Sequence, residues 1–336
     1  MKYRRLGRSG LYTTEITLGT MMFGDMREKG TTPEEATRII DAYIERGGNH
    51  IDTANVYVQG KSEEIIGKAL KGKRNSVILA TKCYFPIADG VNEKGLSRYN
   101  IMRSVEGSLK RLRTDHIDLL YMHCWDPATP IDESLRAFED LVTSGKVRYI
   151  GVSNFKAWQL MKALATSGEN GWNRFIGAQY QYSLVVRDIE DEYLDLFEQE
   201  GLGLLPWGPL GGGFLTGKYK RGERPAEGRI ATHPDHTEES WNRRNTERNW
   251  DIIDEVGRIA EKHDVSYAQV ALAWTLHRPT VASTIIGART LTQLEDNLGA
   301  TEIKLDEDDM TTLNKASNPP ERYPYRFMAA YGRSAG

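Results

Sequence analysis

The sequence has few of the features that mark secreted or membrane-spanning proteins. It contains 2 cysteines among 336 residues, too few for a disulfide framework. No stretch approaches the roughly 18 consecutive apolar residues of a membrane span. The first residues, 1–7, lack the apolar core of a signal peptide. We therefore expect a soluble protein of the cytoplasm, where thiols stay reduced.

An excess of charge of one sign is also absent. The chain has 44 Lys and Arg against 47 Asp and Glu, a formal net charge of -3, and its basic residues are spread out. We therefore expect no nucleic-acid partner and no membrane partner, and the oligomeric state stays open. The Arg-rich stretch 243–248 also contains Asn and Glu, and we interpret it as a solvated helix face.

Short apolar runs, by contrast, alternate with longer amphipathic ones along almost the whole chain. Each short run is apolar at successive positions, which is typical of parallel strands buried on both faces. These predicted strands are Ile16–Leu18, His50–Thr53, Val77–Lys82, Ile117–His123, Val147–Val152, Ile176–Tyr180, Leu202–Trp207 and Thr284–Gly287.

The stretches between these strands show signals for the start and end of helices. Thr32 as N-cap and Glu35 three residues later predict a capping box, with Pro33 between them in the first turn. The pair Gly47-Gly48 would end this helix. Two further helices are expected from near Asp132 to Gly145 and from about Ile189 to Gly201.

Eight strand–helix units in 336 residues predict a (β/α)8 TIM barrel, and we treat residues 1–336 as a single domain. A doubly wound open sheet is the alternative, and periodicity alone does not exclude it. About 80 residues separate the starts of the last two strands, which predicts extra helices or a long loop there. Tyr3-Arg4 and Tyr12-Thr13, with Gly7 and Gly10 between them, predict a β-hairpin that caps the bottom of the barrel.

Four polar residues fall at or just after the ends of three neighbouring strands. They are Asp52, Tyr57, Lys82 and His123. In such a barrel the functional groups collect at the carboxyl ends of the strands. Each residue taken singly is more often a helix cap, a rim residue or a surface charge. Their equivalent positions on the barrel favour a common site.

Together these four residue types suit the reduction of a carbonyl group. Tyrosine has an unperturbed pKa of about 10, which a nearby ammonium such as that of Lys82 lowers. The Asp52 carboxylate would keep that lysine charged, and His123 could orient a carbonyl oxygen. We therefore expect Tyr57 to act as a proton donor.

A metal site is not expected. Cys83 and Cys124 belong to no cluster with zinc-ligand spacing. His233 and His236 lie in a Pro-containing loop with no obvious third ligand, and we expect them to be solvated.

Several motifs in the right order resemble the aldo-keto reductase family, in its bacterial type related to the potassium-channel β subunits. The resemblance covers about residues 3–313. The segments that carry it are Leu18–Met21, Asp52–Tyr57 followed by Ser62–Gly67, Ala80–Lys82, Gly151–Phe155, Gly211–Lys218 and Thr284–Arg289 followed by Gln293 and Asn297.

The resemblance implies a barrel that reduces aldehydes or ketones with NADPH. It implies that Tyr57 is the general acid and that Lys82 and Asp52 adjust its pKa. His123 would orient the substrate carbonyl. Trp207 replaces the usual tyrosine that stacks on the nicotinamide, and Gly208 stands where serine is common. The implied cofactor contacts are Gly19, Thr20, Met21, Asp52, Ser153, Asn154, Gln179, Trp207, Gly208, Pro209, Leu210, Gly212, Lys218, Gly287, Arg289, Gln293 and Asn297.

Two of these cofactor segments also have a physical rationale. The run Gly208–Gly213 lacks the spacing of a Rossmann motif, so it is either a flexible surface loop or a backbone that approaches a pyrophosphate. Lys218 would add positive charge there. Arg289 could pair with a ribose 2′-phosphate, as in NADP-preferring members of the family, and we predict a preference for NADPH over NADH.

The substrate side is less defined by the sequence. We expect Phe23, Tyr57, Phe85, His123 and Trp125 to contact the substrate and the loop 220–239 to lie on the rim. Whether the tail 322–327 folds over the pocket stays open. The aromatic side chains favour an apolar or aromatic carbonyl, but packing on the barrel helices explains them equally well.

Two functional alternatives remain at this stage. The potassium-channel β subunits keep the same four polar residues, so a cofactor-sensing regulatory subunit with negligible turnover is one of them. The barrel pattern begins almost at Met1, without a long N-terminal extension, which we interpret as evidence against that role. The other alternative is physiological oxidation of an alcohol or sugar by the reverse reaction.

Overall fold

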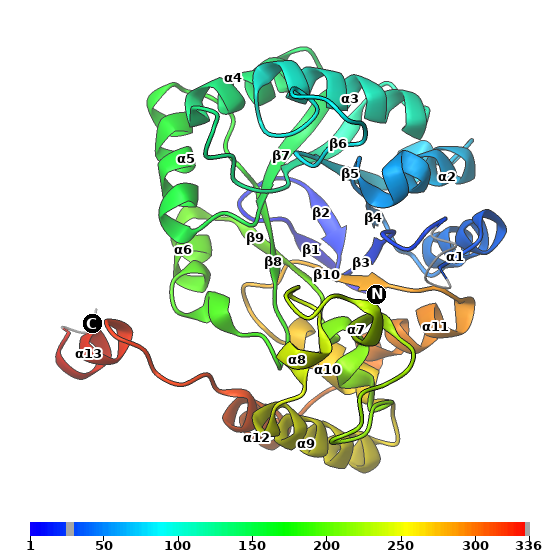
Figure 1. Cartoon of the computed structure of the whole chain (residues 1–336), viewed down its shortest axis with the longest axis vertical. Coiled ribbons are helices and arrows are strands. Elements are labelled where there is room, and N and C mark those ends of the chain that lie inside the picture. Colours follow the sequence, from blue (N-terminus) through cyan, green and yellow to red (C-terminus); the bar gives the residue numbers. More distant parts are fainter. Residues whose placement is uncertain (25–29, 333–336) are drawn as a thin grey trace.

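A computed structural model describes residues 1–24 and 30–332 and contains eight parallel strands surrounded by helices (Figure 1). Neighbouring strands follow the order β10-β3-β4-β5-β6-β7-β8-β9, so chain order is spatial order. The predicted strands are confirmed to within one residue at each end. Their bounds are β3 Ile16–Gly19, β4 His50–Asp52, β5 Ile78–Cys83, β6 Ile117–Met122, β7 Val147–Ser153, β8 Gly177–Gln181, β9 Gly203–Trp207 and β10 Thr284–Gly287.

The sheet closes on itself, which distinguishes the barrel from the doubly wound alternative. On one side β10 pairs with β3 in register Thr284 to Ile16. On the other side the segment just before β10 joins β9. The backbone N–H of Leu204 donates to Thr280 O at 3.1 Å, and the N–H of Ala282 donates to Leu204 O at 2.8 Å. The predicted (β/α)8 barrel is therefore confirmed.

Helices alternate with the strands around the outside of the barrel (Figure 1). In α1 the Thr32 hydroxyl caps the Glu35 N–H as predicted, but the Glu35 carboxylate accepts from the N–H of Leu291 instead of completing a capping box. The helix expected from Ile189 begins later, after a 3-10 turn, η3 (Asp188–Glu190). The bounds are α1 Pro33–Glu45, α2 Lys61–Ala69, α3 Arg98–Leu112, α4 Ile131–Thr143, α5 Ala157–Glu169, α6 Tyr193–Glu200 and α11 Leu291–Gly299.

The long connection between β9 and β10 holds extra helices, as predicted. The Arg-rich stretch 243–248 is only in part the solvated face that we expected: Arg243 and Glu247 are exposed, but two of its arginines are not. Arg244 is buried and its Nε donates to Gly211 O at 3.3 Å, while half-buried Arg248 donates to Ser317 O. Backbone carbonyls thus accept from both guanidinium groups, although Nε of Arg248 has no partner among the described residues. The elements here are η4 Gly211–Thr216, α7 Arg229–Thr232, α8 Trp241–Arg244, α9 Glu247–His263 and α10 Tyr267–Leu276.

An N-terminal hairpin closes the bottom of the barrel, as predicted. Strands β1 (Tyr3–Arg5) and β2 (Tyr12–Thr14) pair antiparallel, and the turn inserts Leu6 among interior residues such as Leu119 and Leu205. Leu6 is fully buried, which contributes about 2 kcal/mol of apolar burial. Access to the barrel interior is therefore blocked at this end.

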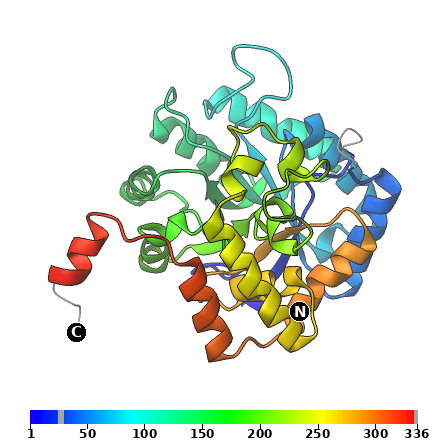
Figure 2. The ribbon, with the colours of Figure 1, turned by 60° about the horizontal axis from the view of Figure 1, so that its bottom comes forward.

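The C-terminal tail lies away from the opposite, open end of the barrel. After α12 (Glu307–Ser317) the chain extends outward to α13 (Tyr325–Tyr331), which projects from the body (Figure 2). Arg322 forms an ion pair with Asp188, and Tyr325 OH bonds to Glu192. Residues 322–327 therefore do not fold over the pocket, a point that the sequence left open. No helix within the described part of the chain is both long and apolar enough for a membrane crossing.

Candidate active site

A cavity of about 1170 Å³ opens at the carboxyl ends of the barrel strands. Ligand pockets commonly measure about 300–1,000 Å³, so this one has room for a large cofactor and a small molecule together. Asp52, Tyr57, Lys82 and His123 all lie on its wall. The barrel thus brings together the four polar residues that the sequence singled out.

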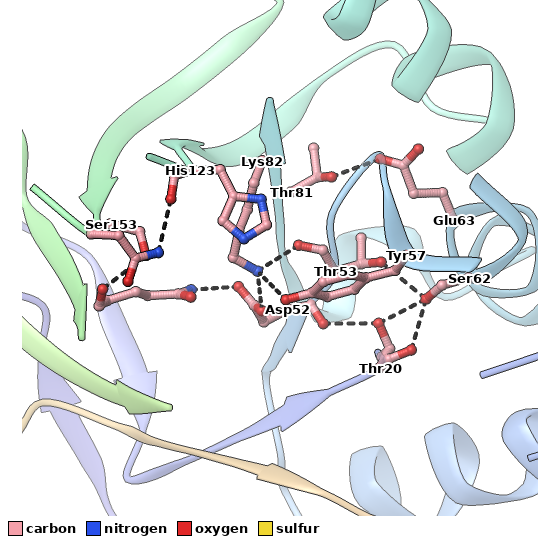
Figure 3. A network of polar contacts seen from close by, with 12 residues as sticks. Thr20, Asp52, Thr53, Tyr57, Ser62, Glu63, Thr81, Lys82, His123 and Ser153 are labelled. Carbon is pink, nitrogen blue, oxygen red and sulfur yellow. Dashed lines mark hydrogen bonds and ion pairs between the residues drawn. The ribbon is translucent and has the colours of Figure 1, made fainter. Parts of the chain in front are cut away.

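A buried ion pair forms the floor of this cavity (Figure 3). Lys82 Nζ donates to Asp52 Oδ1 at 2.5 Å, to Thr53 O at 2.7 Å and to Tyr57 OH at 3.3 Å. Burial lowers the pKa of Lys82, but the charges of Asp52 and Tyr57 outweigh it and hold the pKa above 10.5. The lysine is therefore charged next to the phenol.

The pKa of Tyr57 is raised rather than lowered. Burial raises it above the ordinary value of 10.0, and the nearby Lys82 charge offsets that effect only in part. The expectation of a net lowering is therefore wrong, because it counted the ammonium and not the desolvation. The phenol stays protonated at neutral pH and is able to donate its proton.

His123 stands beside Tyr57 as a neutral imidazole. Burial, and then the charge of Lys82, hold the pKa of His123 well below 6.5. Its ring meets the Tyr57 ring edge-on, with centroids 6.2 Å apart, and Nδ1 has no hydrogen-bond partner among the described residues. A neutral imidazole offers one donor and one acceptor, which suits it to hold a carbonyl oxygen.

The backbone is strained directly after Tyr57. Val58 (φ 49°) and Gln59 (φ 52°) both adopt the left-handed conformation, which is costly for a β-branched residue. Such strain occurs at functional sites where the surroundings enforce it. Here it turns the chain from the end of β4 toward α2 and leaves the Tyr57 side chain at the floor of the cavity.

A second polar group lies across the floor from the ion pair. Ser153 Oγ donates to Gln179 O at 2.8 Å and accepts from Asn154 Nδ2 at 2.9 Å. Gln179 Nε2 in turn donates to Asp52 Oδ2 at 2.5 Å. The residues expected to hold the nicotinamide amide are therefore connected to the candidate catalytic pair, which the sequence did not predict.

The glycine-rich segment forms one side of the cavity. Gly212 (φ 72°) and Gly213 (φ 90°) adopt conformations that other residues rarely take. A Cβ on Gly212 would lie 2.8 Å from Ile230 Cγ2. Trp207 at the end of β9 lines the cavity, and its Nε1 has no partner in the described structure. The segment is therefore part of the site, and not a free surface loop.

Two cations mark the outer end of the cavity. Burial, and then the charge of Arg289, lower the pKa of Lys218. Within residues 1–24 and 30–332 neither cation forms an ion pair with a carboxylate. Gln293 Oε1 accepts from the Arg289 N–H at 2.9 Å and Asn297 Nδ2 donates to Gly287 O at 3.3 Å. All the residues that the resemblance assigned to a cofactor line this cavity.

Comparison with known proteins gives a consistent result. The sequence profile described as "Aldo/keto reductase family" matches residues 15–318. The chain belongs to the aldo/keto reductase family. The resemblance inferred from the motifs is thus confirmed. Membership of this family supports the general assignment of the protein as an oxidoreductase that acts on carbonyl groups.

Individual relatives cover nearly the whole chain. The chain is 43% identical to an uncharacterized oxidoreductase, YrpG, of Bacillus subtilis, over 97% of its own length and 100% of the relative's. It is 35% identical to versiconal hemiacetal acetate reductase of Aspergillus parasiticus, over 96% and 100%. It is also 35% identical to a probable voltage-gated potassium channel subunit beta of Oryza sativa subsp. japonica, over 90% and 92%.

Two of the aromatic residues expected in the substrate pocket of this family member lie elsewhere. Phe23 is fully buried in the apolar core beneath α1, and Trp125 packs against Phe155 and Trp158. Neither lines the cavity, whereas Phe85 does, with its ring 4.9 Å from that of His123. Phe23 and Trp125 are therefore packing residues.

The sequence did not identify a charged pair on the cavity wall. Arg229 Nε lies 2.5 Å from Glu239 Oε2, and Arg229 reaches Met21 Sδ on the other side at 3.7 Å. Only the whole loop 220–239 was predicted as rim. Across the described ranges, no cluster of three or more His, Cys, Asp or Glu side chains could hold a metal ion.

Proposed function

We propose that this family member reduces an aldehyde or ketone to an alcohol with NADPH, and that Tyr57 donates the proton. The observation that supports this most is the position of Lys82 Nζ, 2.5 Å from Asp52 Oδ1 and 3.3 Å from Tyr57 OH, at the floor of a large cavity. We further propose that it acts in the cytoplasm on small carbonyl compounds.

The residues around the cavity fit a dinucleotide that carries phosphate groups. Ser153 and Asn154 offer hydrogen-bonding groups for the amide end, and Trp207 offers an aromatic face for stacking. Lys218 and Arg289 provide cations at the outer end, where a ribose 2′-phosphate would pair with Arg289. When bound, NADPH supplies the hydride.

The protein's own residues would handle the proton and the carbonyl oxygen. Neutral His123 donates a hydrogen bond that holds the oxygen next to the Tyr57 hydroxyl. As the oxygen gains negative charge, Tyr57 passes its proton to it, and the charged Lys82 stabilises the phenolate that remains. Asp52 keeps Lys82 charged in this buried setting.

The direct test measures NADPH consumption by its absorbance with aliphatic, aromatic, sugar and polycyclic carbonyls. We expect turnover of at least one class, and the same assay with NADP and the product alcohol gives the favoured direction. Tight NADPH binding without turnover of any carbonyl would contradict the proposal.

Such a negative result would favour a sensor role. The relatives named as probable potassium channel subunits are the observation behind this rival. A sensor would bind NADPH and co-purify with a membrane partner. An enzyme of free metabolites would purify without that partner and consume NADPH.

A further inference from the structure

Three threonines hold the outer side of the strand ends that carry the site (Figure 3). Thr20 follows β3, Thr53 follows β4, and Thr81 lies near the end of β5. All three are fully buried, and their hydroxyl groups bond to consecutive residues at the start of α2, Ser62 and Glu63.

Ser62 connects the first two of these strands. Its hydroxyl donates to Thr20 O at 2.9 Å and lies 2.9 Å from Thr20 Oγ1 and 3.0 Å from Thr53 Oγ1. Thr20 Oγ1 also donates to Asp52 O at 2.9 Å. One serine therefore connects the side chain of Thr53, the residue after Asp52, to Thr20, which itself bonds the Asp52 carbonyl.

Glu63 connects the third strand. Its Oε1 accepts from Thr81 Oγ1 at 2.6 Å and its Oε2 accepts from Arg111 Nε at 2.7 Å. Glu63 is fully buried, and a buried carboxylate is very costly unless it is paired and hydrogen-bonded. Both of its oxygens are thus committed, one to β5 and the other to α3.

Arg111 is itself held firmly by the packing of α2 against α3. A Cβ on Gly67 would lie 2.5 Å from Arg111 O, and a Cβ on Gly60 would lie 2.7 Å from Arg111 Cδ. Glycine at these positions lets the two helices approach closely. Arg111 therefore provides a fixed point for the Glu63 carboxylate.

The outer contacts reach the site because neighbouring residues in a strand point to opposite faces. Thr81 faces the helices while Lys82, the next residue, faces the cavity. Thr53 follows Asp52 in the same way, and its carbonyl accepts from Lys82 Nζ at 2.7 Å. Restraining the two threonines from outside restrains the ion pair inside.

We propose that Glu63 and Ser62 are positioning residues, which set Lys82 against Asp52 and Tyr57 through the buried hydroxyls of Thr81 and Thr53. This inference rests on the proposed reductase mechanism. The bond from Lys82 Nζ to Tyr57 OH is 3.3 Å, beyond the usual range of hydrogen bonds to oxygen. A small shift of β5 would therefore remove it.

The test replaces Thr81 by Val, which keeps the shape and removes the hydroxyl, and by Ser, which keeps the hydroxyl. Thr17→Val is the matched control, because buried Thr17 Oγ1 bonds to buried Ser283 Oγ at 2.6 Å elsewhere on the barrel. Both valine variants lose one buried hydroxyl, and the unfolding midpoint of Thr81→Val should fall further, because it leaves a carboxylate oxygen rather than a hydroxyl without its partner. Only Thr81→Val should disturb Lys82.

The first readout needs no turnover. The ionisation of Tyr57 is followed by NMR of carbon-labelled tyrosine, with Tyr57→Phe for assignment. In Thr81→Val we expect the pKa of Tyr57 to rise further above that of the wild type, since Lys82 would no longer lower it as strongly. Thr81→Ser and Thr17→Val should match the wild type.

The second readout is the kinetics of carbonyl reduction. We expect kcat of Thr81→Val to fall about tenfold through misplacement of Lys82, with NADPH affinity within about twofold of wild type. Thr81→Ser should restore kcat. If the wild type reduces no carbonyl, the reductase proposal fails, whereas the NMR titration still decides whether these contacts set Lys82.

Two results would overturn the inference. One is a folded Thr81→Val protein in which the pKa of Tyr57 and kcat equal those of Thr17→Val. The other is a loss of kcat and NADPH affinity in the same proportion, which would mean general loosening. If Thr81→Val does not fold, Glu63→Gln replaces it, with the same expected directions, because it removes the charge that binds Arg111 and keeps the shape.

Discussion

The two ends of the cavity differ in whether their charged side chains are paired. At the inner end Lys82 and Asp52 neutralise each other, fully buried and hydrogen-bonded. At the outer end Lys218 and Arg289 lie near enough for the Arg289 charge to lower the pKa of Lys218, and the described residues give them no carboxylate partner. The inner charges are arranged before any ligand arrives, whereas the outer charges need an anion to complete them.

This difference indicates that the inner end contributes to the stability of the fold, whereas the outer end contributes to the binding of a ligand. The inner pair is part of the folded structure, so altering it affects folding as well as chemistry. The outer cations repel each other, so they contribute to binding and not to folding. Variants at the two ends should therefore fail in different assays.

The largest effect is expected at the inner end for Tyr57→Phe. This change removes only the hydroxyl, so kcat for carbonyl reduction should fall by at least about a hundredfold, the usual contribution of a positioned acid. NADPH affinity, measured by fluorescence titration, should stay within about twofold of wild type. Near-wild-type turnover in a folded variant would rule out the tyrosine mechanism.

Lys82→Met and Lys218→Met compare the two ends directly. Loss of Lys82 leaves the Asp52 carboxylate buried without its partner, which should lower the free energy of unfolding by about 3–5 kcal/mol. Loss of Lys218 relieves repulsion with Arg289, so the free energy of unfolding should stay unchanged or rise slightly. Denaturant titration of both variants measures this, and equal destabilisation would disprove the distinction.

Arg289→Ala should change cofactor preference without changing stability. A charge-assisted bond to a 2′-phosphate contributes about 1.5–3 kcal/mol, so the preference for NADPH over NADH should fall roughly tenfold to a hundredfold. NADH affinity serves as the internal control and should stay constant. If the ratio of the two affinities did not change, Arg289 would not be the 2′-phosphate contact.

The smallest effect near neutral pH concerns His50, beneath the inner pair. Burial, and then the charge of Lys82, lower the pKa of His50 from 6.5 to about 3. Below pH 6.5 the unfolded chain therefore binds a proton at His50 that the folded protein does not bind. As the pH is lowered from 6.5 toward 3, the free energy of unfolding decreases by about 1.4 kcal/mol per pH unit.

His50→Gln removes this titration. Denaturant unfolding at mildly acidic and neutral pH should show a smaller loss of stability for the variant than for wild type. Equal losses in both proteins would mean that His50 is not neutral in the fold.

The sequence predicted the barrel well because parallel strands buried on both faces leave continuous apolar runs. The inner residues could be placed because they follow strand ends that the barrel brings together, whereas the outer residues were placed by the resemblance of their motifs to those of the family. Phe23 and Trp125 were misplaced because an aromatic residue after a strand can turn toward the cavity or toward a helix, and only packing decides.

Other features could not be predicted, because they depend on the relative size of opposing pKa effects or on hydrogen-bond partners distant in the sequence. The net shift of Tyr57 depends on how far burial outweighs Lys82, which no motif encodes. Arg244 looked solvated because its carbonyl partners, Gly211 and Glu238, are brought to it only by the fold. The bond between Glu63 and Thr81 joins residues 18 positions apart that share no pattern.

The hairpin that inserts Leu6 into the bottom of the barrel closes that end. Whatever reaches Tyr57 therefore approaches from the opposite end, where the cavity opens. The direction of approach is thus set at the end of the barrel farthest from the chemistry.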